Sequence, residues 1–119
     1  MEFDLAIDRE AQYVRVTISG EPQFAELLSM IHLLGVESET WEGRRVLVDL
    51  RGVHTPFDHG QQFRIGEEAA ASLHHMDRIA SLVPPERITR VSEKAARRMG
   101  TNVRVFDDEG RAIRWLTED

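Results

Sequence analysis

The amino-acid sequence indicates an α/β domain with a five-stranded, mostly parallel sheet, an antiparallel N-terminal hairpin and about four helices. Two stretches near the N-terminus alternate apolar and polar residues, which is typical of a hairpin with one buried face. Beyond them, short apolar runs alternate with segments of helical periodicity, the pattern of β–α–β crossover units. A chain of 119 residues is the length of one such domain, so we expect residues 1–119 to form a single domain.

The first third of the chain contains the hairpin and a helix. Phe3, Leu5 and Ile7 alternate with polar residues, and a second alternating run follows a turn-like segment at residues 8–12. That second run consists of Val14, Val16 and Ile18. From Pro22 onwards the apolar residues follow helical spacing, which predicts an amphipathic helix with one inward face: Phe24, Leu27, Leu28, Ile31 and Leu34.

The remainder repeats strand and helix three times. Strands are predicted at residues 46–50, 78–83 and 103–106. Helices are predicted from about 59 to about 74, over a segment carrying Ile88, Val91 and Ala95 that Gly100 can end, and after Asp107 or Asp108. In the last helix Ile113 and Leu116 share a face, and Trp115 can cover the edge of the core.

Composition excludes several classes of function. Without cysteine, the chain has no disulfide framework, thiolate metal site or cysteine nucleophile. Its formal net charge of −6 opposes sequence-independent attraction to nucleic acid. The N-terminal Met-Glu-Phe-Asp-Leu is acidic where a signal peptide is basic, and no apolar stretch approaches the roughly 18 residues that span a bilayer. We therefore expect a cytoplasmic protein with no transmembrane segment and no nucleic-acid partner.

The junction after the 46–50 strand is the candidate binding region. Ligands and partners of α/β domains often bind where a parallel strand ends and the next helix begins. Here Gly52 and Pro56 mark the loop, and Asp58 can cap the next helix with Gln61 three residues on. The candidate binding residues are Asp49, Arg51, His54, Thr55, Phe57, Asp58, His59 and Phe63.

Residues 49–53, Asp-Leu-Arg-Gly-Val, leave the third strand, and residues 103–107 and 112–116 close the chain as Val-Arg-Val-Phe-Asp and Ala-Ile-Arg-Trp-Leu. With the order of elements, these segments resemble the SpoIIAA-like (STAS/SEC14-type) domains, in particular small stand-alone bacterial members. The resemblance covers nearly the whole chain. It implies a non-enzymatic regulatory module that works through a protein partner, with no cofactor.

The loop before the second helix departs from the anti-sigma-factor-antagonist branch that it resembles. A gap-free comparison puts Phe57 at the family's aspartate, Asp58 at its phosphorylatable serine and His59 at the next serine. Asp58 then supplies a permanent negative group at a helix N-terminus, where the helix dipole favours it, although aspartate is also a common N-cap. Thr55 is a further, weaker candidate for phosphorylation.

Three alternatives stay open. The SEC14 side of the resemblance implies a pocket for a lipid or another apolar small molecule, for which Phe57, Phe63, Met76 and Trp41 are candidates. Aromatic residues at 57–63 could instead form a homodimer interface. An enzyme with an acid/base or metal site is the third alternative, because His54, Asp58 and His59 cluster near Asp49, and a second group contains His74, His75 and Asp77. Neither group has a recognised ligand spacing, so we expect no metal.

The helix predicted near residue 90 also carries a basic stripe. Arg87, Arg90, Lys94 and Arg97 recur at helical spacing opposite its apolar residues. Such a stripe is usually a solvated face. Its alternative interpretation is a docking surface for an acidic partner or a phosphate-bearing ligand.

Overall fold

The computed structural model describes residues 3–87 and 90–118. It confirms the predicted architecture. The strands are β1 (Phe3–Arg9), β2 (Val14–Gly20), β3 (Arg45–Val53), β4 (Arg78–Leu82) and β5 (Val103–Phe106). The helices are α1 (Phe24–Ser38), α2 (His59–Ser72), α3 (Val91–Arg98) and α4 (Glu109–Thr117), and a 3₁₀ turn, η1 (Pro85–Arg87), precedes α3.

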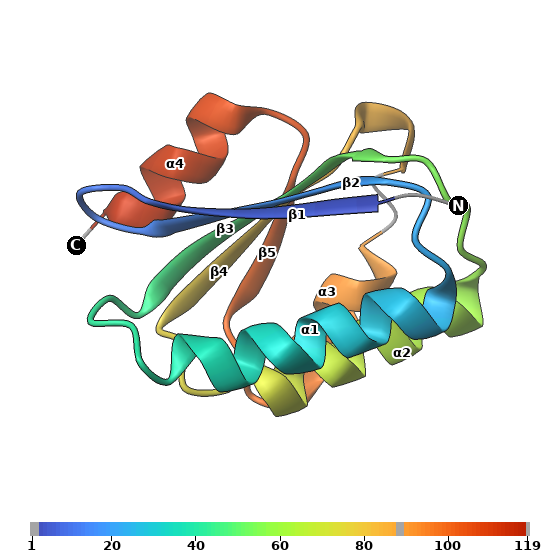
Figure 1. Cartoon of the computed structure of the whole chain (residues 1–119), viewed down its shortest axis with the longest axis horizontal. Helices are drawn as coiled ribbons and strands as arrows, with labels where there is room; N and C mark the ends of the chain where they lie inside the picture. Colours follow the sequence, from blue (N-terminus) through green and yellow to red (C-terminus); the bar gives the residue numbers. More distant parts are fainter. Residues whose placement is uncertain (1–2, 88–89, 119) are drawn as a thin grey trace.

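The five strands form one sheet in the order β1-β2-β3-β4-β5, antiparallel between β1 and β2 and parallel elsewhere. Each crossover therefore moves one strand further in the same direction. Because β–α–β crossovers are right-handed, this order places all the crossover helices on one face. Figure 1 shows α1, α2 and α3 on that face and α4 alone on the other.

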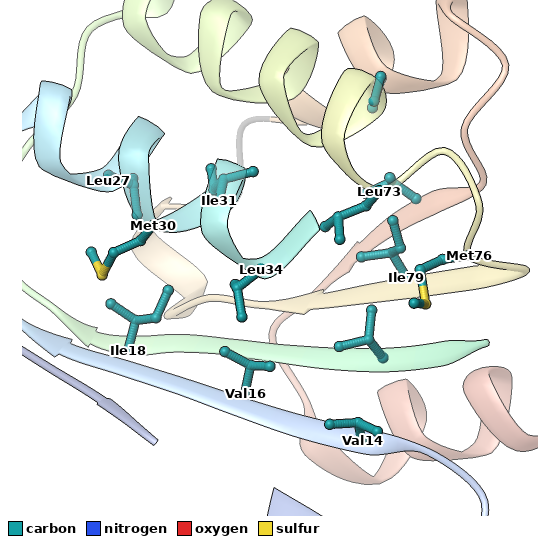
Figure 2. Close-up of a cluster of buried hydrophobic side chains, with 14 of the residues drawn as sticks. Val14, Val16, Ile18, Leu27, Met30, Ile31, Leu34, Leu73, Met76 and Ile79 are labelled. Atoms are coloured by element: carbon teal, nitrogen blue, oxygen red, sulfur yellow. The ribbon is translucent and has the colours of Figure 1, made fainter. Parts of the chain in front are cut away.

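The larger core lies between the sheet and the crossover helices. Alternate residues of β2 point into it, as do the inner face of α1 and the end of α2 (Figure 2). The labelled side chains are Val14, Val16, Ile18, Leu27, Met30, Ile31, Leu34, Leu73, Met76 and Ile79. The second core is small and lies under α4, where Ala112 and Leu116 pack against Leu47, Ala80 and Leu82.

The structure corrects several predicted boundaries. Residues 8 and 9 belong to β1, and the hairpin turn closes later, where the Glu10 N–H donates to the carbonyl of Tyr13 over 2.9 Å. Strand β3 continues beyond Leu50 to Val53 because residues 52 and 53 still pair with β2. The third crossover helix begins at Val91, and Ile88 lies outside the described residues. Within the described chain, no helix is long and apolar enough to cross a membrane.

The two edges of the sheet differ. At β5 the outward backbone groups are bound by side chains from the α3 region: Val105 N–H donates to Glu93 Oε2 over 2.7 Å, and Arg97 Nε donates to the Val103 carbonyl over 2.9 Å. At β1 the side chains of Leu5 and Ile7 are exposed. Two residues of the predicted basic stripe, Arg90 and Arg97, thus bind the β5 edge, and both remain exposed, as does Lys94.

Candidate functional site

The loop between β3 and α2 is held at its base and exposed at its tip. The His54 N–H donates to the carbonyl of Gly20 over 2.8 Å, and Thr55 Oγ1 donates to the carbonyl of Pro22 over 2.6 Å. The two bonds tie the loop to the end of β2 and to the segment that follows it. Beyond them, the side chains of His54, Pro56, Asp58 and His59 are exposed.

Asp58 begins α2 as its N-cap. Its Oδ1 accepts a 2.8 Å bond from the Gln61 N–H, and Gln61 Oε1 accepts a 3.0 Å bond from the Asp58 N–H. This capping box satisfies two backbone donors that the first turn of a helix leaves free. Asp58 is therefore a structural cap, as its residue type predicts, and its carboxylate still lies at an exposed helix N-terminus.

Phe57 turns inward from the same loop. Its ring lies 6.3 Å from that of Phe24, centroid to centroid, and packs against the larger core. Phe57 also lines a cavity of about 320 Å³ between the loop, α2 and the sheet. Leu27, Leu50 and Ile65 contribute apolar walls to this cavity.

A smaller space of about 80 Å³ continues between the sheet and the crossover helices. The two spaces share five lining residues: Leu27, Leu50, Ile65, Ser81 and Ser92. All five lie on separate elements, so no single segment of the sequence carries a signal for the cavity. We refer to these two adjoining spaces together as the apolar cavity.

Asp49 and Arg51 lie on the opposite face of the sheet, under the N-terminus of α4. Arg51 binds both carboxylate oxygens of Asp49, at 3.1 Å from Nε and 2.9 Å from Nη2, and Arg15 reaches Oδ2 at 2.7 Å. Glu109, the first residue of α4, binds Arg51 at 2.7 Å and Arg15 at 3.4 Å. Two arginines and two carboxylates thus join β2, β3 and α4.

The charges and hydrogen bonds of this network shift the pKa values of its own members. Burial alone would raise the pKa of Asp49, but the hydrogen bonds and positive charge of Arg51 and Arg15 outweigh burial, and the pKa lies below its ordinary value. Hydrogen bonds from Arg15 and Arg51 likewise lower the pKa of Glu109. Hydrogen bonding to Asp49 raises the pKa of Arg51 above its already high value. All four groups are therefore charged at neutral pH, as a structural ion-pair network requires.

The candidate residues thus divide into three sets. His54, Thr55, Asp58 and His59 share the loop and the helix start with Phe57, whereas Asp49 and Arg51 belong to the α4 face. Phe63 lies one turn further along α2, 39% exposed, and does not line the cavity. Trp41 and Met76, candidates for an apolar pocket, are buried beside His75 and do not line it either.

The histidine clusters do not converge. Among residues 3–87 and 90–118, no group of three or more His, Asp or Glu side chains is placed to hold a metal ion. His75 Nε2 lies 2.7 Å from Ser38 Oγ, but that hydroxyl already donates to the Gly35 carbonyl over 3.0 Å. The Ser38 hydroxyl therefore accepts a hydrogen bond from the His75 imidazole N–H. In an activated serine nucleophile the hydroxyl instead donates to the imidazole.

Comparison with known proteins identifies the fold and the family. The chain is similar in structure to an uncharacterised DUF3478-family protein with a SpoIIAA-like fold from Shewanella loihica PV-4, with a TM-score of 0.60 and 17% identity over 96% of this chain and 93% of that one. It is also similar to an anti-sigma factor antagonist from Mycobacterium paratuberculosis, with a TM-score of 0.64 and 12% identity over 98% and 96% of the two chains. No curated protein matches the chain. The SpoIIAA-like family description matches residues 13–117, so the chain belongs to the SpoIIAA-like family.

Proposed function

We propose that this protein is a non-enzymatic regulatory module that binds a protein partner through the exposed corner between β3 and α2. We define this corner surface as His54, Pro56, Asp58, His59 and Phe63. The observation that carries the proposal is the exposure of charged and imidazole side chains on a loop and helix start that hydrogen bonds hold in place, with an exposed aromatic ring one turn further along α2. Exposed aromatic residues beside polar groups are typical of binding surfaces.

Family membership supports the same function. An anti-sigma factor antagonist, which is a protein that acts on another protein, shares the fold. In this chain the position that resembles the family's phosphorylatable serine is Asp58. We propose that its carboxylate supplies a fixed negative charge, so that partner binding does not await phosphorylation.

The test separates charge from folding. Asp58→Asn keeps an N-cap but removes the charge, whereas Phe63→Ala removes an exposed ring with little effect on the core. We expect affinity capture from the native cell to recover a partner with wild type and to lose it with both variants. Arg9→Gln, exposed on β1, is the matched surface control and should retain it. Equal recovery with all four proteins would refute the corner surface.

A second candidate function is the binding of an apolar small molecule, and the apolar cavity favours it. Its volume falls at the lower end of the range for ligand sites, and aliphatic side chains form most of its walls. Two serines, Ser81 and Ser92, line both of its parts and could orient a polar group of the ligand.

Native mass spectrometry tests this candidate. If the cavity holds a ligand, protein from its native host should carry an added mass that denaturation releases. Ser81→Leu, which places a larger side chain in the cavity, should lose that mass, whereas Ser29→Leu on the exposed face of α1 should keep it. An unliganded wild-type protein would count against the candidate. The same spectra show whether the protein is a homodimer.

A further inference from the structure

A groove lined mainly by arginine lies at the β5 edge of the sheet, away from the corner surface. Its volume is about 430 Å³, within the range of small-molecule sites. We call it the arginine groove. Its lining residues are Arg90, Glu93 and Arg97 from the α3 region, Arg104, Val105 and Phe106 from β5, and Arg111 from α4.

The groove contains guanidinium groups from both faces of the sheet. Arg90 and Arg97 approach β5 from the α3 side, where they donate to the carbonyls of Val105 and Val103. Arg104 pairs with Ala80 in the β4–β5 register, so it lies on the α4 face, and Arg111 belongs to α4 itself. The outer edge of β5, whose backbone groups are already hydrogen-bonded to side chains, runs between these two sets of arginines. We call it the closed edge.

That closed edge restricts what the groove can bind. The Val105 N–H is bound by Glu93, and the carbonyls of Val103 and Val105 accept from arginines, so these groups are not free to pair with an added strand. What remains available is guanidinium N–H. A ligand therefore has to be recognised through side-chain donors, as anions are.

Arg104 and Arg111 have the most donors to offer. The Arg104 guanidinium carbon lies 5.6 Å from the ring centroid of Trp115. Within the described part of the chain, the guanidinium N–H groups of Arg104 make no hydrogen bond. Contact with an aromatic face orients the planar fork and leaves its N–H groups free. Arg111 is exposed, and its Nε lies 3.9 Å from Asp108 Oδ2, beyond hydrogen-bonding distance.

The carboxylate of the groove does not cancel this charge. Glu93 is buried, and it accepts from the Val105 N–H and from Arg90. Four guanidinium groups therefore surround one carboxylate that is already engaged, in a protein whose overall charge is negative. Because the negative net charge of the protein repels anions at long range, anion binding in the groove depends on short-range, bidentate contacts. Planar guanidinium groups make such contacts with phosphate oxygens.

We propose that the arginine groove binds the phosphate of a small phosphorylated ligand, with Arg104 and Arg111 as the principal donors. This site is independent of the function proposed for the corner surface. The phosphate can belong to a soluble molecule or to a phospholipid headgroup, and the experiment distinguishes the two.

The experiment titrates the folded 119-residue chain with inorganic pyrophosphate and follows amide signals by NMR. Saturable shifts should appear for residues 104–106 and 111. Arg111→Gln and Arg104→Gln should each weaken binding at least about tenfold, the expected loss of one charge-assisted contact. Arg9→Gln, at the opposite edge of the sheet, should bind like wild type. Arg111 is highly exposed, and among residues 3–87 and 90–118 its one ion pair is the distant one with Asp108, so its variant folds even if loss of Arg104 disturbs Trp115.

Two further probes identify the class of ligand. If the protein co-sediments with vesicles containing phosphatidylinositol phosphate, but not with phosphatidylcholine vesicles, and Arg111→Gln abolishes this binding, the ligand is a phospholipid headgroup. An acidic peptide of glutamates that binds with this dependence while pyrophosphate does not would overturn the phosphate assignment. Absence of saturable binding to any phosphate probe, or equal weakening by Arg9→Gln, would overturn the site itself.

Discussion

Asp58 has two separable properties, its hydrogen bond to the helix backbone and its charge. Asp58→Ala removes both and should lower the free energy of unfolding by about 1 kcal/mol, whereas Asp58→Asn retains an N-cap and should cost only a few tenths of a kcal/mol. Urea denaturation of the three proteins measures the difference. If the alanine variant is as stable as wild type, the capping box contributes nothing to stability.

Residue type predicted the capping role, because aspartate followed by glutamine at the third helical position is a known N-terminal pattern. The location of Asp49 and Arg51 was harder to predict. Two residues apart on a strand, they share a face with Leu47, and the sequence pattern gives no sign that α4 covers that face. They are candidates because they lie close to the loop in sequence. Successive side chains of a strand point to opposite faces of the sheet, and those of Asp49 and Arg51 point to the α4 face, away from the loop.

The ion-pair network joins α4 to the sheet, and it should make stability depend on pH. The pKa of Asp49 is lowered in the folded state, so its contribution is fully present above the unfolded value of about 3.9 and is lost as pH falls through the folded value. Asp49→Asn should therefore cost about 2 kcal/mol at pH 7, and less as the pH falls below about 4.

Urea denaturation at several pH values between about 3 and 7 tests this expectation. Asp8→Asn, at an exposed position on β1, is the control and should change little at any pH. A penalty for Asp49→Asn that stays constant down to the lowest pH would show that the carboxylate charge is not what stabilises the α4 contact.

On the face of the sheet that carries α1, α2 and α3, α2 and α3 pack closely at a glycine. A Cβ added at Gly66 of α2 would lie 2.3 Å from the carbonyl oxygen of Ser92 and 2.9 Å from Ala95 Cβ. Gly66→Ala should therefore destabilise the protein by about 1–3 kcal/mol, although alanine favours helix by roughly 1 kcal/mol. Gly110→Ala in α4 meets only ordinary contacts and should be neutral or stabilising. Thermal unfolding compares the two, and a stabilised Gly66→Ala would contradict the close approach of α2 and α3.

The order of elements and the mixed sheet follow from hydrophobic periodicity, because each strand and helix carries its own local pattern. The apolar cavity and the arginine groove could not be predicted in this way. Each combines side chains from three or more elements, such as Leu27, Ile65 and Ser81 for the cavity. The basic stripe illustrates the limit: periodicity placed Arg90 and Arg97 on one face, but only the tertiary structure shows that both bind the β5 edge.

Together, the sheet offers three separate surfaces: the corner between β3 and α2, the arginine groove at β5 and the exposed apolar side chains of β1. Of these three, the corner combines exposed aromatic and charged groups with Asp58, which we propose takes the place of the family's phosphorylatable serine. This combination favours it as the partner-binding surface.

Hydrogen–deuterium exchange of the protein with and without its captured partner tests that assignment most directly. We expect protection in the complex at residues 54–65, which comprise the loop and the first turns of α2. Protection confined to β1, to α4 or to the β5 edge, with unchanged exchange at 54–65, would contradict it.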